Sequence, residues 1–172
     1  GFPSYLDPPA SLPILVGANW RYFKGISSAP PSAWKTVGFD DTTWLQGPSG
    51  FGYGDGDDAT VLSDMSTYLS VYIRREFTIS NLSAIGGLKL TIDYDDGFVA
   101  YVNGTEVARS ASMSGAGTPP AYNAVATSHE AVAGGGGPVE TFTIATSLLV
   151  QGTNVIGIQG HNRATTSTDF SL

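Results

Sequence analysis

Residues 98–109, Phe-Val-Ala-Tyr-Val-Asn-Gly-Thr-Glu-Val-Ala-Arg, carry the clearest structural signal in the chain. The pair Asn103-Gly104 lies between two runs of alternating side chains, which is the pattern typical of a two-residue type I′ hairpin. The expected cross-strand pairs are Val102 with Thr105, Tyr101 with Glu106, and Ala100 with Val107. The two faces of this hairpin then differ, with Phe98, Ala100, Val102 and Val107 on one and Val99, Tyr101, Glu106 and Ala108 on the other.

Further strand patterns lie on both sides of this hairpin, at Trp20–Phe23, Tyr68–Ile79, Leu88–Tyr94, Thr141–Ile144, Asn154–His161 and Asp169–Leu172. Two stretches rich in glycine, Gly47–Asp58 and Ser110–Pro138, are expected to be irregular loops. We expect eight or nine strands and no substantial helix. This pattern predicts one all-β domain, an antiparallel β-sandwich of the jelly-roll type, over residues 14–172. Residues 1–13, with four prolines, are expected to form a linker or edge segment.

The charge balance limits the classes of partner. The chain of 172 residues has 8 Lys and Arg against 15 Asp and Glu, a formal net charge of −7. Nucleic-acid binding is not expected, because phosphate neutralisation needs clustered basic residues. The sequence has neither a polybasic run for anionic lipid nor an apolar run of the roughly 20 residues that span a membrane.

Low charge and the lack of cysteine indicate the setting of the protein. Charged residues make up 13% of the chain, about half the usual share for a soluble domain. The chain has no cysteine, so disulfides and thiolate zinc sites are excluded. This composition is common in secreted β-proteins, and many exported bacterial proteins lack cysteine. Since the chain begins at Gly1, we expect a monomeric module excised from a longer secreted or cell-surface protein, with flanking domains.

Two acidic clusters are candidate calcium sites, because calcium takes six to eight oxygen ligands. They comprise Asp55, Asp57 and Asp58 with Asp64, and Asp93 with Asp95 and Asp96. The first is not an EF-hand loop, since its sixth and twelfth positions are Thr60 and Ser66. The alternative for both clusters is a plain turn, in which Asp side chains accept backbone N–H groups.

Sugar binding needs an apolar platform and planar polar groups. Of the three tryptophans, Trp20 and Trp44 are expected in the core, while Trp34, which follows Pro30-Pro31, is the best candidate for an exposed platform. The other candidate ligand-binding residues are Tyr53 and Tyr122 for stacking, with Arg109, His161, Asn162 and Arg163 for hydrogen bonds. The alternative is ordinary polarity at strand ends. The Arg74-Arg75 pair is expected to pair with acids across a sheet.

No catalytic arrangement is indicated. A glycosidase needs two carboxylates at a fixed separation, and no spacing here demands such a pair. The chain has two histidines and no G-x-S-x-G motif, so neither a zinc site nor a serine hydrolase is supported. We therefore expect a protein that is not an enzyme.

Several motifs, in order, resemble one family. They are Phe39-Asp40-Asp41-Thr42-Thr43-Trp44 with Gly50-Phe51-Gly52-Tyr53-Gly54, Tyr72-Ile73-Arg74-Arg75-Glu76-Phe77, Tyr94-Asp95-Asp96-Gly97-Phe98 through Val102-Asn103-Gly104, and Leu149-Val150-Gln151-Gly152-Thr153-Asn154-Val155-Ile156. The closing residues His161-Asn162 and Ser167-Thr168-Asp169-Phe170 also fit. Together they are similar to jelly-roll modules of the galactose-binding-like superfamily, including the sugar-binding domain of family 2 glycoside hydrolases. The resemblance covers roughly residues 18–172.

This resemblance implies a domain that binds a polysaccharide or oligosaccharide, often with a structural calcium, and it implies no catalytic centre. The leading hypothesis is a carbohydrate-binding module of a secreted bacterial protein. The alternative is a structural or adhesive jelly roll that is stabilised by calcium and that binds protein or joins domains. A small hydrolase is the third hypothesis.

Overall fold

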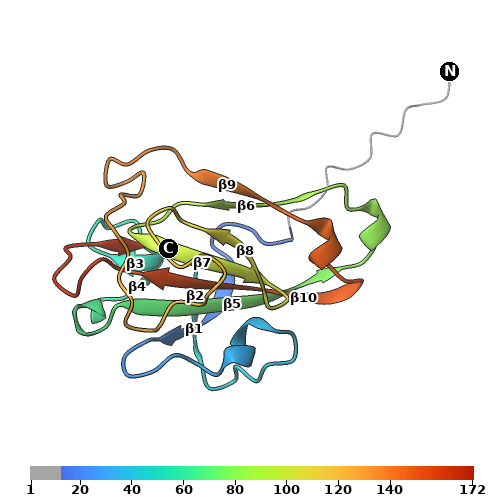
Figure 1. Ribbon diagram of the computed structural model, residues 1–172, viewed down its shortest axis with the longest axis horizontal. Helices are drawn as coiled ribbons and strands as arrows, with labels where there is room; N and C mark the ends of the chain where they lie inside the picture. The colour runs from blue at the N-terminus through green and yellow to red at the C-terminus, as the bar shows by residue number, and fades with distance from the viewer. Residues whose placement is uncertain (1–12) are drawn as a thin grey trace.

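A six-stranded antiparallel sheet of order β2-β1-β5-β10-β7-β8 forms one layer of the protein (Figure 1). The structure, a computed structural model, describes residues 13–172. Its strands are β1 Asn19–Lys24, β2 Leu45–Pro48, β3 Phe51–Tyr53, β4 Thr60–Val61, β5 Ser70–Ile79, β6 Leu88–Ile92, β7 Gly97–Val102, β8 Thr105–Arg109, β9 Glu140–Ile144, β10 Gly152–His161 and β11 Phe170–Ser171. The helical elements are single 3-10 turns, η1 Ser32–Lys35, η2 Met65–Thr67, η3 Leu82–Ala84 and η4 Thr146–Leu148.

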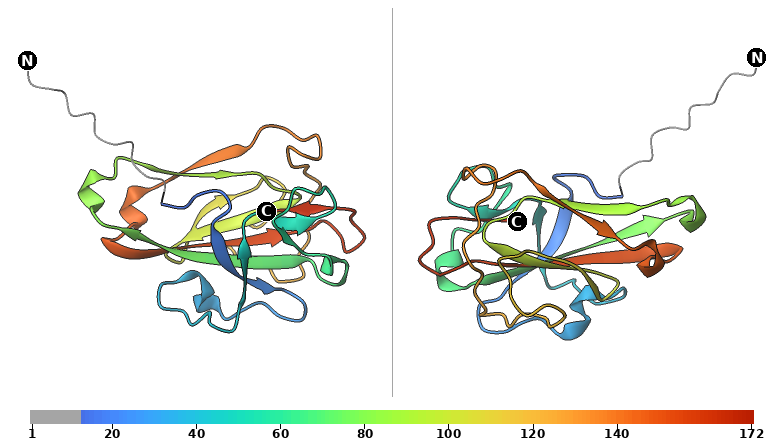
Figure 2. Two further views of the ribbon diagram at one scale, coloured as in Figure 1. Left: turned by 180° about the vertical axis from the view of Figure 1, so that it is seen from behind. Right: turned by 45° about the horizontal axis from the view of Figure 1, so that its top comes forward.

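The opposite layer consists of two smaller sheets, β6-β9 and β11-β3-β4 (Figure 2). The main core fills the space between the layers, with fully buried side chains such as Phe51, Phe98 and Phe170. The expected all-β sandwich is therefore confirmed. The described residues form eleven strands rather than eight or nine, because several pairings are only two or three residues long.

A second core lies on the other face of the six-stranded sheet. Strand alternation sends Ile73 and Ala100 into the main core, while Tyr72, Val99 and Tyr101 point the opposite way. This second group packs beneath the η1 turn and the long segment 110–138. Because both of its faces are covered, β7 is buried at all six positions and shows no exposed polar row.

The hairpin at 98–109 is confirmed, including its type I′ turn. Asn103 and Gly104 both have positive φ, 49° and 88°, as that turn requires. The expected pairs Val102–Thr105 and Tyr101–Glu106 are observed, but the prediction for Ala100 is wrong. A β-bulge places Ala108, not Val107, opposite Ala100, and so moves Ala108 into the main core.

The glycine count predicts an irregular loop over Gly47–Asp58, but part of this segment is ordered as a strand. Strand β3 lies within it, pairing with β11 on one side and in parallel with β4 on the other. Gly52 permits this close approach, since a Cβ there would lie 2.0 Å from the Phe170 carbonyl oxygen. Glycine therefore marks tight backbone packing here.

Residues 110–138 contain no strand or helix, as expected, yet burial and hydrogen bonds hold part of this segment against the sandwich. Ser110 and Ser112 are buried and hydrogen bond to each other, and Ser112 donates to the Asp96 carbonyl. The linker or edge segment expected at residues 1–13 lies almost entirely outside the described residues. Within residues 13–172, no helix has the length and apolar character needed to cross a membrane.

Candidate metal centre

The turn Asp95-Asp96-Gly97 joins β6 to β7 at one end of the sandwich. The backbone of Asp95 exchanges two hydrogen bonds with Ser171 of β11, of 2.9 and 3.0 Å. A Cβ on Gly97 would meet Ser112, Met113 and Ala126 at 2.8–3.0 Å. Glycine thus lets the long segment 110–138 settle directly over the turn, which brings that segment beside Asp95.

Three carboxylates from distant parts of the chain meet at this place. Asp95, Glu130 and Asp169 each offer an oxygen, and these oxygens all lie within 4.8 Å of one another. Asp95 comes from the turn before β7, Glu130 from the long segment 110–138, and Asp169 from the residue before β11. We call this group the buried cluster.

Asp95 is the central member of the buried cluster. Asp95 is only 3% exposed, and its Oδ1 has no hydrogen-bond partner among the described residues. Burial, followed by the charges of Asp96, Asp169 and Glu130, raises the pKa of Asp95 to about 8. A buried carboxylate without a partner is costly, and neighbouring carboxylates add repulsion. A bound cation removes both penalties.

The donor set fits calcium. Carboxylate oxygens are hard ligands, and the described cluster contains neither thiolate nor imidazole among its three members. Backbone carbonyls or water would complete a coordination number of six to eight. An ion held here would tie the β6–β7 turn, segment 110–138 and the C-terminal strand together, which is a structural role.

Asp96, also predicted as a metal ligand, accepts hydrogen bonds from two backbone N–H groups. Its Oδ1 accepts the backbone N–H of His129 at 3.1 Å, and its Oδ2 accepts that of Arg163 at 2.8 Å. It is 1% exposed and holds two loops in place. These bonds are those of the tight-turn interpretation, whereas Asp95 Oδ1 has no such partner among the described residues.

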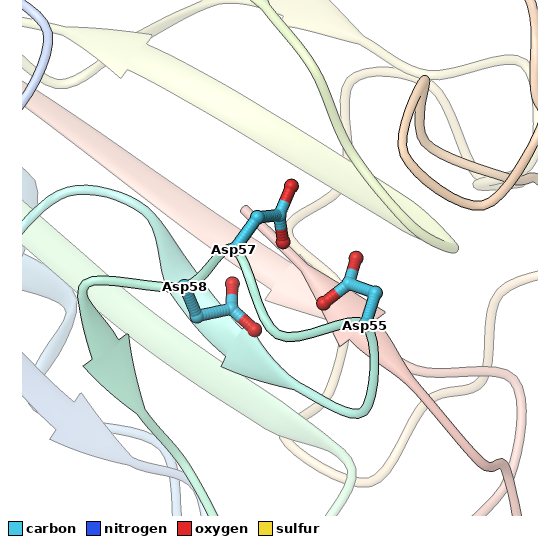
Figure 3. Close-up of side chains that lie close together, drawn as sticks. All are labelled: Asp55, Asp57 and Asp58. Atoms are coloured by element: carbon cyan, nitrogen blue, oxygen red, sulfur yellow. The ribbon is translucent and has the colours of Figure 1, made fainter.

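The second acidic group, which we call the exposed cluster, consists of Asp55, Asp57 and Asp58 between β3 and β4 (Figure 3). Its three oxygens also lie within 4.8 Å of one another, but Asp55 and Asp57 are exposed to solvent. Burial and the charges of Asp55 and Asp57 raise the pKa of Asp58 to about 7. Asp64 is not part of it, because Asp64 pairs with Lys24 at 2.7 Å.

The two clusters lie on either side of β11. Ser171 pairs through its backbone with Asp95, and its hydroxyl donates to Asp55 Oδ2 at 3.1 Å. Asp93 was grouped with Asp95 in the sequence, yet its carboxylate accepts the backbone N–H of Val132 at 3.0 Å. The two acidic groups are thus neighbours in space, with Ser171 between them.

The expectation that Trp34 is exposed is wrong. Trp34 is 4% exposed and packs against Trp44, Tyr72 and Tyr101, with ring centroids 5.3–6.3 Å away. A Cβ on Gly157 would lie 2.5 Å from the Trp34 ring, so the sheet closes directly on it. Trp34 is a core residue that cannot offer a stacking face to a sugar.

The expected core positions of the other two tryptophans, Trp20 and Trp44, are confirmed at 7% and 8% exposure. Tyr53 and Tyr122 are half-buried. The Tyr53 hydroxyl donates to the Ser167 carbonyl at 2.9 Å, and Tyr122 packs against the second core.

Most of the predicted hydrogen-bonding residues hold the protein's own loops. His161 and Asn162 are fully buried; His161 contacts the Ala124 carbonyl at 2.8 Å, and Asn162 donates to the Tyr53 hydroxyl at 3.1 Å. Arg109 forms an ion pair with Glu106 at 2.8 Å and donates to two carbonyls of segment 110–138. Arg163 is exposed, and its side chain reaches two serines. Among the predicted binding residues, the structure thus brings Asn162 into direct contact with Tyr53.

Two members of the buried cluster, Glu130 and Asp169, were not identified from the sequence. Asp169 lies in the closing motif that carries the family resemblance, so attention to that motif could have found it. Glu130 lies in a stretch without any hydrophobic pattern, and only the packing of segment 110–138 brings it to Asp95.

Comparison with known proteins gives the fold's relatives. No protein-family model matches the chain, and no curated protein matches it by sequence. Solved structures do match. They include Bacteroides uniformis beta-glucuronidase, with a TM-score of 0.54 and 16% identity over 86% of this chain and 14% of that one. A beta-glucuronidase from glycoside hydrolase family 2 gives a TM-score of 0.53 and 16% identity, covering 86% of this chain and 13% of that one.

A third match is a calcium-binding mutant of Bacteroides uniformis beta-glucuronidase 2, with a TM-score of 0.55 and 13% identity over 91% of this chain and 17% of that one. The chain therefore spans 13–17% of the length of these three proteins. At such identities the likeness shows a shared fold. The chain has the fold of a small part of family 2 glycoside hydrolases, which is consistent with the resemblance in its motifs.

Proposed function

We propose that the chain is a non-catalytic carbohydrate-binding module of a secreted bacterial protein that acts on polysaccharide or sits at the cell surface. The observation that carries this proposal is the shared fold with a small part of glycoside hydrolases, combined with the order of the sequence motifs. Most of each enzyme's length lies outside the matched part.

We further propose that the module holds a structural calcium at Asp95, Glu130 and Asp169. The support is the buried Asp95 Oδ1, which has no partner among the described residues and faces two further carboxylates within 4.8 Å. Calcium here fixes segment 110–138 against the C-terminal strand, so the ion maintains the shape of one end of the domain.

A structural or adhesive domain remains the second candidate function, and one observation favours it. Trp34, the predicted sugar platform, is buried, and the buried cluster ties together three segments of the domain's own chain. In this alternative the calcium-stapled domain joins other domains or binds a protein.

A glycan array separates the two functions. The carbohydrate-binding module is expected to retain a defined group of glycans in millimolar calcium and to lose affinity in EDTA, since segment 110–138 loosens. Retention of no glycan, with unchanged folding, would favour the structural domain. Turnover of any compound in a panel of chromogenic glycosides would contradict the non-catalytic assignment.

A further inference from the structure

A polar cavity of about 390 Å³ lies where strands β2, β1 and β5 meet the segment before β2. The strand register builds it: Arg21 of β1 pairs with Gln46 of β2 on one side and with Arg74 of β5 on the other. These three side chains therefore stand in one row across three strands. Phe39, from the segment before β2, also lines the cavity and is half-buried.

Positive charge is concentrated there. The chain has five arginines and a net charge of −7, yet three of the five, Arg21, Arg74 and Arg75, line this one cavity. Two acids, Asp41 and Glu76, also line it. The cavity wall thus carries a net positive charge within an acidic protein, which attracts anions to this place.

Two of the arginines are already engaged. Arg74 is 2% exposed; it forms an ion pair with Asp41 and donates to the carbonyls of Trp34 and Thr36. Arg75 donates to the Asn19 carbonyl. Arg74 also forms an ion pair with Glu76 at 3.5 Å, so the two acids of the cavity already balance its charge.

Arg21 is the available one. Its side chain is 36% exposed, its contact with Asp41 is 3.6 Å long, and it makes no hydrogen bond within residues 13–172. The side chains of Gln46 and Asn19 beside it are exposed. Arg21 therefore has guanidinium donors that a ligand rich in acceptors can reach.

We propose that this cavity binds the anionic group of an acidic saccharide, with the Arg21 guanidinium as its principal contact. This inference rests on the proposed carbohydrate-binding function and names its substrate class. A guanidinium presents a planar fork that matches a carboxylate or a sulfate ester. The neighbouring amides of Gln46 and Asn19 suit sugar hydroxyls, and the half-buried Phe39 ring offers apolar surface to a sugar ring.

The test uses isothermal titration of the intact chain with matched probes. Oligogalacturonate is compared with its fully methyl-esterified form, and dextran sulfate with dextran. The anionic member of at least one pair is expected to bind at least tenfold more tightly, and its affinity is expected to fall with added salt. The pair that shows the difference identifies the recognised group. A difference in the oligogalacturonate pair indicates a carboxylate, and a difference in the dextran pair indicates a sulfate ester.

The variant Arg21→Gln is expected to weaken that binding roughly tenfold or more, the loss typical of a charge-assisted hydrogen bond. Lys89→Gln is the matched control, because Lys89 is an exposed cation on β6 in the opposite layer. Gln46→Ala is a second variant at the exposed edge of the cavity, and melting curves check that each variant folds.

The outcomes distinguish the acidic-saccharide site from the proposed carbohydrate-binding function on which it rests. Equal binding of neutral and anionic probes, undiminished by Arg21→Gln, would overturn the acidic-saccharide site and leave the module's carbohydrate binding intact. Failure to bind any probe here, together with a blank glycan array, would overturn both.

Discussion

The buried and the exposed acidic clusters contain the same chemistry, three carboxylates within 4.8 Å, but differ in how the chain assembles them. Asp55, Asp57 and Asp58 are close because they are close in sequence, and two of the three are exposed to water. Asp95, Glu130 and Asp169 come from three separate segments, and Asp95 is 3% exposed. Water screens the exposed Asp55 and Asp57, whereas Asp58 and Asp95 each bury a carboxylate oxygen that has no hydrogen-bond partner among the described residues. The nearly complete burial of Asp95 and the assembly from three separate segments distinguish the buried cluster from the exposed one.

The largest expected effect is a fall in the free energy of unfolding at low pH. It concerns His161, whose contact with the Ala124 carbonyl anchors segment 110–138, and the buried cluster depends on that segment. Burial lowers the pKa of His161 from 6.5 to about 4. In the unfolded chain the imidazole takes up a proton near pH 6.5, so protonation favours unfolding. The stability contributed by neutral His161 is fully present above about pH 6.5 and falls by about 3 kcal/mol as the pH drops to about 4.

His161→Asn tests this expectation, because its amide can still donate to the Ala124 carbonyl but does not titrate. Free energies of unfolding measured from pH 7 to pH 4 should fall less steeply in the variant than in the wild type. Parallel curves for the two proteins would show that His161 does not anchor the segment as a neutral side chain.

The next effect tests whether Glu130, one of the two members that the sequence did not reveal, belongs to the site. Calcium that binds only the folded state stabilises it by about 2.7 kcal/mol at a hundredfold excess over Kd. Glu130→Gln should reduce that stabilisation markedly, since one charged ligand is lost. Melting curves in EDTA and in millimolar calcium measure the difference, and an unchanged calcium response would remove Glu130 from the site.

The smallest effect belongs to the exposed cluster. Asp57→Asn changes a solvent-exposed side chain, and surface substitutions of this kind usually alter stability by less than about 0.5 kcal/mol. Its calcium response should equal that of the wild type. If Asp57→Asn instead abolishes the response while Glu130→Gln retains it, the roles of the two clusters are reversed.

Local pattern predicted much of the fold. The hairpin at 98–109, its type I′ turn and the long strands follow from alternation and from Asn103-Gly104, which act over a few residues. The bulge opposite Ala100 was not predicted, because one extra residue leaves the local alternation nearly unchanged. Strand β3 was missed as well, since its glycine-rich sequence is typical of a loop, and its pairing depends on β11 over a hundred residues away.

The candidate site was predicted only in part, for a related reason. Asp95 was identified by its short motif, but Asp96 beside it turned out to hold backbone N–H groups. Glu130 reaches Asp95 only through the packing of an irregular segment. Trp34 was misplaced because its proline-flanked position suggests a surface loop, whereas the η1 turn inserts the ring against Tyr72 and Tyr101. Tertiary packing decides such cases, and no local pattern encodes it.

The most direct test of the account is calcium titration calorimetry on metal-free wild type and Asp95→Asn, with Asp57→Asn as the matched control. We expect one calcium per chain in the wild type and in Asp57→Asn, and none in Asp95→Asn. Metal-free Asp95→Asn should also be at least as stable as metal-free wild type, because the neutral amide needs neither a proton nor a cation to be buried. Undiminished calcium binding by Asp95→Asn would contradict the claim that the buried cluster is the metal centre.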